Sequence, residues 1–320
     1  MAEKKYKATR DSYGEMLAEL GAENERVVVF DADLAASTKT SVFAKKFPKR
    51  FFDCGIAEAN MMSIAAGAST TGLIPFASTF AMFAAGRAFE QVRNSIGYPH
   101  LNVKIAATHA GLSVGEDGAS HQCNEDIATM RVIPGMTVIC PADDVETRAA
   151  IRAAADYVGP VYLRFGRMAV PCIYETENYS FEIGKGIRLT DGEDVTIIAT
   201  GLMVSRAIEA AQLLGQRNIS ARVLDFHTIK PIDRSMIEKA AKETGAIVTA
   251  EEHSVIGGLG SAVSEVVAET APVPILRVGV QDVFGESGSG NEVLLKYGLS
   301  AKSIVEAVEK VMELKRANKG

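Results

Sequence analysis

Short apolar segments recur along the chain and alternate with segments whose apolar residues follow helical spacing. The apolar segments contain many β-branched residues and little polar alternation, which is typical of strands buried on both faces of a parallel sheet. Strands that alternate with helices predict an α/β fold with helices on both faces of the sheet. In the first half of the chain the predicted strands are residues 26–30, 103–107, 136–140 and 161–165.

Two segments between these strands have the pattern of helices. Residues 58–70 (EANMMSIAAGAST) are almost wholly apolar after Glu58. Residues 144–157 (DVETRAAIRAAADY) have apolar positions at helical spacing, and Asp144 is the expected N-cap.

The alternation breaks near residues 170–192, where proline, glycine and polar residues gather, and then restarts. We therefore predict two α/β domains, residues 1–180 and 190–320, each a mostly parallel sheet covered by helices. The strands predicted after the break are residues 195–199, 221–225, 246–250 and 275–279, each with a helix behind it, and the last helix is amphipathic.

Length and composition narrow the class of protein. A chain of 320 residues exceeds the usual size of a single core, in agreement with two domains. A net charge of −6 argues against broad binding to nucleic acids or anionic membranes. There is no apolar run long enough to span a bilayer and no apolar signal-peptide core, and the four cysteines have no metal-ligand or disulfide spacing. We expect a cytoplasmic protein with reduced thiols.

Charged and small polar residues follow the predicted strands of the first domain, at the edge where open α/β sheets bind ligands. The segments are DADLAAST (31–38), FFDCGIAEAN (51–60), ATHAGLSVGEDGASHQ (107–122) and RFGRMAVP (164–171). In the second domain, GGLGS (257–261) is either a phosphate cradle or a tight strand-to-helix turn, and we favour the turn. Residues 226–231 and 251–253 are expected at turns or interfaces.

Glu58 has two interpretations. A carboxylate at the head of an apolar helix favours the helix dipole and needs no further role. A carboxyl in apolar surroundings also has a raised pKa and can share a proton with a ring nitrogen, which suits catalysis.

Considered together, these segments resemble the C-terminal half of a transketolase, in which a pyrimidine-binding domain precedes the transketolase C-terminal domain. The most specific of them is GEDGASHQ with TH seven residues before it, and with the second domain they cover nearly the whole chain. The matching segments are residues 8–10, 31–37, 51–69, 76–83, 108–122, 133–143 and 163–167.

The resemblance implies that the chain binds the cofactor thiamine diphosphate. Glu58 would hydrogen-bond the aminopyrimidine ring and thereby activate the cofactor. Phe80 and Phe83 would pack on that ring, and Asp33 would lie near the thiazolium side. The aromatic residue that the family has three positions after Phe83 is Gly86 here, so the pocket wall differs.

The resemblance also implies a sugar-phosphate site. His121 would lie near the carbonyl oxygen of the donor sugar, and Asp117 would read the configuration of a hydroxyl. The terminal phosphate would be bound by Arg10, Ser37, His109 and Arg167, because two guanidinium groups supply charge-assisted hydrogen bonds.

The Mg²⁺ ion of the cofactor is the part for which this chain has no ligands. In the family its ligands come from a GDG motif and a later Asn in a preceding domain, whereas this sequence has no GDG and the resemblance begins near Met1. We therefore expect a separate N-terminal subunit with the GDG motif, an α2β2 heterotetramer, and a transketolase of the pentose phosphate pathway that is inactive without its partner.

Three alternatives stay open at this point. The chain could be the β subunit of a 2-oxo acid dehydrogenase E1 component or a deoxyxylulose-phosphate synthase-like enzyme. It could also be a non-catalytic assembly partner, although the joint presence of Glu58, Asp117 and His121 argues against that role.

Overall fold

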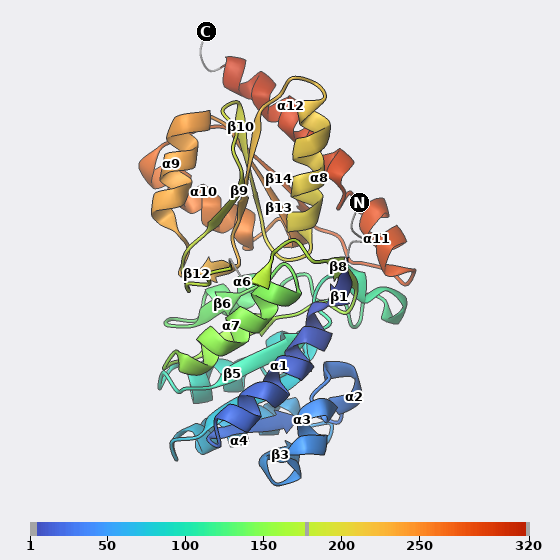
Figure 1. The fold of residues 1–320 in the computed structure, drawn as a ribbon, viewed down its shortest axis with the longest axis vertical. Helices are drawn as coiled ribbons and strands as arrows, with labels where there is room; N and C mark the ends of the chain where they lie inside the picture. Colours follow the sequence, from blue (N-terminus) through green and yellow to red (C-terminus); the bar gives the residue numbers. More distant parts are fainter. Residues whose placement is uncertain (1–4, 177–178, 318–320) are drawn as a thin grey trace.

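The computed structural model describes residues 5–176 and 179–317, and residues 177 and 178 of the predicted linker lie outside the described part. The chain folds into two α/β domains, as predicted. Figure 1 shows them end to end, with the first domain in blue to green and the second in yellow to red.

The first domain is built on a seven-stranded sheet with the order β12-β6-β7-β5-β4-β2-β3, parallel except for β12. All four predicted strands are present. The interior strand β4 was not predicted, because IPFASTF contains a proline and small residues in place of a β-branched run, yet every residue in it is buried. The strands are β2 (Val27–Asp31), β3 (Phe51–Asp53), β4 (Ile74–Phe80), β5 (Lys104–Thr108), β6 (Thr137–Ile139), β7 (Val161–Arg164) and β12 (Thr228–Lys230).

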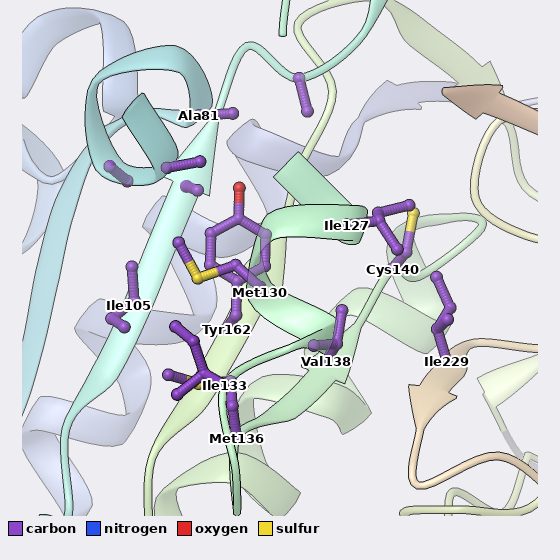
Figure 2. Packing of buried hydrophobic residues seen from close by; sticks show 14 of the residues in the cluster. Ala81, Ile105, Ile127, Met130, Ile133, Met136, Val138, Cys140, Tyr162 and Ile229 are labelled. Carbon is purple, nitrogen blue, oxygen red and sulfur yellow. The ribbon is translucent and has the colours of Figure 1, made fainter. Parts of the chain in front are cut away.

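Helices cover both faces of this sheet. Helices α1 (Thr9–Glu23) and α7 (Asp144–Asp156) pack together in one apolar cluster with the sheet. Helices α4 (Glu58–Ser69) and α6 (Asp126–Arg131) belong to the other face, where Figure 2 shows Met130 of α6 beside Tyr162 and Ile105. The smaller elements of this domain are β1 (Tyr6–Ala8), α2 (Ala35–Thr38), α3 (Ser41–Lys46), α5 (Phe89–Gln91) and β8 (Ala169–Pro171).

The predicted cap of α7 was wrong by one residue. The side chain of Asp143, not Asp144, accepts the hydrogen bond from the Glu146 amide, at 2.9 Å. Asp144 is the first helical residue and binds the Lys7 ammonium group instead. Either carboxylate could have capped the helix, and only the backbone conformation of Asp143 decides between them.

The second domain has a five-stranded sheet with the order β14-β13-β10-β11-β9, in which only β9 is antiparallel to its neighbour. Helices were predicted behind the strands and are present. The strands are β9 (Ile187–Thr190), β10 (Val195–Ala199), β11 (Ala221–Asp225), β13 (Ile247–Ser254) and β14 (Ile275–Val280), and the helices are α8 (Met203–Gly215), α9 (Arg234–Thr244), α10 (Leu259–Thr270), α11 (Gly290–Lys296) and α12 (Ala301–Ala317).

The two domains are joined by more than the linker. Strand β12 lies beyond residue 190 in the sequence, but it pairs with β6 and so extends the sheet of the first domain. Its Ile229 is buried in an apolar cluster that contains residues of both domains (Figure 2). The segment 226–231 therefore has the interface role expected for it.

The segment 251–253 also lies at this interface. Glu252 accepts a hydrogen bond from the Ser113 amide at 2.6 Å, and His253 accepts one from the Ala128 amide at 3.3 Å. Glu251 accepts hydrogen bonds from the amides of Leu259 and Gly260 at the start of α10. That helix start is therefore already bound to a carboxylate, in agreement with the turn favoured for GGLGS.

A pair of carboxyl groups is buried between the domains. Glu146 of α7 accepts a hydrogen bond from the Tyr179 hydroxyl at 2.6 Å, and Asp225 of β11 accepts one from Tyr174 at 2.7 Å. Burial, followed for Glu146 by the charge of Asp225, raises the pKa of Glu146 well above its usual range. Burial raises the pKa of Asp225 to about 7.

This pair should make the stability of the chain depend on pH. Because the folded-state pKa of Asp225 is raised, its contribution is complete below the unfolded-state value near 4 and is lost as the pH rises through about 7. We expect the free energy of unfolding to fall by on the order of 2 kcal/mol between about pH 5.5 and about pH 8.5. Urea unfolding of the wild type and Asp225→Asn tests this, because the variant should have the flatter profile. Equal pH profiles would contradict the assignment.

None of the helices in the described ranges is both long and apolar enough to cross a membrane. The four cysteines all lie in these ranges as free thiols, as predicted.

Candidate functional site

The carboxyl ends of β2, β4, β5 and β7 meet at one edge of the first sheet, and most of the predicted site residues lie there. Phe80 is the last residue of β4, and His109 follows β5. Arg10 reaches this edge from the first turn of α1, and Arg167 from the segment after β7. Parallel pairing places these strand ends side by side, so residues far apart in the sequence become neighbours.

His109 contacts two predicted site residues at this edge. Its ring stacks on Phe80, and its Nε2 atom binds Arg10. The rings of Phe80 and His109 are stacked with centroids 3.8 Å apart. One guanidinium nitrogen of Arg10 lies 2.9 Å from His109 Nε2 and also donates to the carbonyl oxygen of Ser37 at 3.1 Å. Arg10 therefore contacts the backbone of Ser37 and not its hydroxyl.

His109 is held in the neutral state. Burial, and then the charge of Arg10, lowers its pKa to about 3. Because Arg10 can only donate, Nε2 accepts, and Nδ1 is then the protonated nitrogen that donates to Thr108 Oγ1 at 2.8 Å. In this arrangement His109 orients Arg10 and carries no charge of its own.

Glu58 begins α4 and is 1% exposed, as its apolar surroundings in the sequence suggested. Its two carboxylate oxygens lie 3.0 and 3.1 Å from one guanidinium nitrogen of Arg87. The Arg87 side chain is 53% exposed, so a buried acid is paired with a base at the surface. Arg87 was not predicted to be part of the site.

The backbone after β4 explains the position of Arg87. Phe83–Arg87 is a π-helical turn, in which the Ala88 amide bonds the Phe83 carbonyl five residues earlier at 3.0 Å. This wider turn places Arg87 above Phe83, with its guanidinium carbon 4.7 Å from the ring centroid. Phe83 is itself stacked on Phe80 at 5.7 Å. Such turns are rare and are frequent at functional sites.

The GEDGASHQ segment forms a tight loop against the second domain. Gly115 and Gly118 have φ values of 79° and 74°, a conformation that residues with a side chain rarely adopt. The Gln122 side chain donates to the carbonyl oxygens of Leu112 and Glu286, at 3.2 and 2.9 Å. The second domain therefore fixes the shape of a loop that carries candidate site residues.

Charged groups gather along this loop. Arg167 donates to Glu116 at 2.8 Å and lies 3.8 Å from Asp117, and it also binds the Val114 carbonyl. The hydrogen bond from its own backbone and then the charge of Arg167 lower the pKa of Glu116. Glu116 is thus the nearest acidic partner of Arg167.

His121 faces the aromatic pair. Its ring lies edge-on to Phe83 at 5.5 Å and to Phe80 at 6.2 Å. Its Nδ1 is 2.9 Å from Ser120 Oγ, which fixes the orientation of the imidazole. The imidazole of His121, which could transfer a proton, therefore lies next to Phe80 and Phe83, the rings that could hold a planar ligand.

Asp33 is exposed, and its part in the site is through the backbone. It has a φ of 60°, and its amide donates to Asp53 Oδ1 at 3.1 Å. Asp53 also accepts from the Gly55 amide at 2.9 Å, so it joins the loop after β2 to the loop that leads to Glu58. Neither Asp53 nor Arg87 was predicted. The sequence offered one signal for Arg87, because it is a charged residue in an apolar run, four positions after Phe83.

The donor set fits the pyrimidine half of thiamine diphosphate. A buried carboxylate suits a hydrogen bond to a ring nitrogen, and two stacked phenyl rings suit a planar heterocycle. The buried Nε of Arg10 has no hydrogen-bond partner, so this guanidinium has capacity left for an anion. In the ranges that the structure describes, there is no group of three or more His, Cys, Asp or Glu side chains that could hold a metal ion.

Comparison with known proteins agrees with this geometry. Residues 5–172 match the family model for the transketolase pyrimidine-binding domain, and residues 184–304 match the one for the transketolase C-terminal domain. The chain is 54% identical over 310 residues to a putative transketolase C-terminal section of Methanocaldococcus jannaschii, covering 96% of this chain and 97% of that protein.

Two further relatives show the same full-length match. A 6-deoxy-6-sulfo-D-fructose transketolase subunit of a Clostridium species is 45% identical, with 96% of this chain and 95% of that protein covered. The solved structure of a split-gene transketolase, described as an inactive β4 tetramer, is 58% identical with a TM-score of 0.91, and the match covers 97% of this chain and 99% of that one. The chain therefore belongs to the transketolase family, of which it contains the pyrimidine-binding and C-terminal domains.

Proposed function

We propose that the chain is the C-terminal subunit of a two-subunit transketolase that transfers a two-carbon ketol unit from a ketose phosphate to an aldose phosphate. The observation that carries the proposal is a connected set of side chains at one sheet edge. Glu58 binds Arg87, which lies over Phe83. Phe83 contacts Phe80 and His121, and Phe80 stacks on His109, which binds Arg10. The carboxyl group and the stacked rings suit a heterocyclic cofactor. The guanidinium group beside them suits an anionic sugar.

Each side chain has a stated task in this proposal. When bound, thiamine diphosphate supplies the nucleophilic carbon and the electron sink for carbon–carbon cleavage. Glu58 hydrogen-bonds the aminopyrimidine ring, and Phe80 and Phe83 pack on it. Asp33 lies toward the thiazolium side. These four residues hold the cofactor's ring system and leave the sugar to other residues.

The sugar is bound by the groups around Arg10. His121, oriented by Ser120, moves a proton at the donor's carbonyl oxygen. Asp117 accepts a hydrogen bond from a sugar hydroxyl. Arg10 and Arg167 bind the terminal phosphate together with Ser37, and neutral His109 keeps Arg10 in position.

A partner subunit completes this site. We propose that an N-terminal subunit with a GDG motif holds the diphosphate and Mg²⁺, and that the enzyme is an α2β2 heterotetramer. The similarity to C-terminal sections and separate subunits supports a divided enzyme. The inactive β4 state of the similar split transketolase supports the need for a partner.

The test is co-expression of the chain with a partner that carries the GDG motif. We expect two-carbon transfer from xylulose 5-phosphate to ribose 5-phosphate by the purified complex and none by the chain alone. Activity of the chain alone would contradict the divided site. The relatives include transketolases named for 6-deoxy-6-sulfo-D-fructose and apulose 4-phosphate, so these sugars form the comparison arms. A strong preference for either would replace the proposed donor.

Arg167→Ala should mainly raise the KM for phosphorylated donors. Loss of a charged hydrogen bond costs about 1.5–3 kcal/mol, which corresponds to a rise of roughly 10- to 100-fold. Steady-state kinetics of the complex with phosphorylated and unphosphorylated ketoses measure this. Arg188→Ala, which removes an arginine on the edge strand β9, is the matched control. An equal loss with both kinds of donor would contradict the phosphate assignment.

A further inference from the structure

The Glu58–Arg87 ion pair covers the two features that suit a planar nitrogen heterocycle. Both carboxylate oxygens of Glu58 accept from Arg87. The same guanidinium group lies over the ring of Phe83. A ring that packs on Phe83 and hydrogen-bonds Glu58 would therefore occupy the space and the acceptors that Arg87 contacts.

The two members of the pair differ in exposure to solvent, and this difference allows Arg87 to leave. Glu58 is almost completely buried at the head of α4, while more than half of the Arg87 side chain is exposed. A buried carboxylate without a partner is costly, so Arg87 stabilises it while the pocket holds no ligand. An arginine at the surface, by contrast, can turn into water and keep its charge solvated, so the exchange costs little once a ring donor replaces it.

The local backbone also permits this movement. Arg87 ends the π-helical turn and directly follows Gly86, which has no side chain to confine it. A Cβ atom at Gly86 would meet only the flexible end of Met82, at 2.7 Å. The neighbour of Gly86 on this side is therefore a flexible side-chain end and not rigid backbone.

We propose that Arg87 is a displaceable cap on Glu58, which occupies the carboxylate and the Phe83 face until the aminopyrimidine ring of the cofactor binds. Arg87 is in this sense a positioning residue that acts through Glu58. The identity of the ring rests on the proposed function, whereas the cap itself rests on the ion pair and its exposure. Removal of the cap should strengthen cofactor binding, opposite to the effect expected for a residue that binds the cofactor.

The binding experiment uses the complex of this chain with its partner and measures association of thiamine diphosphate with Mg²⁺ by stopped-flow fluorescence and calorimetry. If the cap is closed in 90–99% of molecules, its loss in Arg87→Met should lower the Kd by about 10- to 100-fold. Association should be slower to the wild type than to Arg87→Met, because the Glu58–Arg87 pair must open before the ring reaches the carboxylate. Arg87→Lys, which keeps the positive charge, should associate more slowly than Arg87→Met.

Arg93→Met is the matched control, since Arg93 lies on the next π-helical turn and donates to Asn94. It should bind the cofactor as the wild type does. Weaker binding by Arg87→Met, or a Kd and association rate equal to those of the wild type, would overturn the cap.

A second measurement uses the chain alone and is independent of the cofactor. Arg87→Met should lower the midpoint of thermal unfolding, because Glu58 is left buried without a partner, and should have no such effect in a Glu58→Gln background. Additive effects of the two substitutions on the unfolding midpoint would contradict the Glu58–Arg87 ion pair. If the wild-type complex binds no thiamine diphosphate, the proposed function fails, and the thermal measurement still decides whether the pair exists.

Discussion

Glu58→Ala is expected to slow exchange of the C2 proton of bound thiamine diphosphate by about 10²- to 10⁴-fold, the usual range for loss of a general acid–base group. The carboxylate is buried at the head of α4, and alanine offers no group that can hydrogen-bond the ring in its place. Exchange into deuterium oxide, followed by NMR in the complex with the partner subunit, measures the rate.

Two controls make this result specific. Glu90→Ala removes an exposed carboxylate on the same polypeptide segment as Arg87 and should leave exchange unchanged. Binding of the cofactor to Glu58→Ala must also be measured. Otherwise loss of bound cofactor could be mistaken for slow exchange of the C2 proton. An exchange rate equal to that of the wild type at full occupancy would remove Glu58 from the proposed role.

Asp126→Ala is expected to destabilise the chain by about 3–5 kcal/mol, because it leaves a buried arginine without its counter-ion. Arg164 forms two hydrogen bonds with the Asp126 carboxylate, at 2.8 and 3.1 Å, and Tyr162 donates a third at 2.8 Å. Figure 2 shows Tyr162 among the buried side chains of the apolar cluster. Arg164 also donates to the Glu252 carbonyl, so the pair connects the two domains.

Chemical unfolding of single and double variants tests this assignment. The double variant Asp126→Ala/Arg164→Met should recover much of the lost stability, since a buried pair can be replaced by apolar residues at little cost. Burial raises the pKa of Asp126, but the charge and hydrogen bonds of Arg164 outweigh this and lower it below its usual value. The stability that the pair gives the wild type is therefore present above about pH 4 and lost in acid. Additive losses in the double variant would contradict the coupling.

The elements with strong local patterns could be predicted from the sequence. The predicted strands and helices depend on β-branched runs and helical spacing, and these are properties of neighbouring residues. Strand β4 was missed because its burial comes from its place between β5 and β2 in the sheet and not from its own composition. Strand β12 joins the first sheet for the same reason, since its partner β6 lies far from it in the sequence.

The site was predictable only in part. The residues that follow strands were correctly expected at one sheet edge, because parallel strands bring their carboxyl ends together. The partners of those residues were not predictable. Arg87 reaches Glu58 only through a π-helical turn, and Arg167 selects Glu116 only because the second domain fixes the loop.

The sequence by itself thus determined the fold class, the family and the strand ends on which candidate chemistry lies, because local periodicity and motif spacing carry that information. The tertiary structure alone decided that Glu58 is covered by Arg87, that His109 is neutral and that Asp225 is buried beside Glu146. These properties depend on burial and on distances between side chains far apart in the sequence, which no local pattern contains.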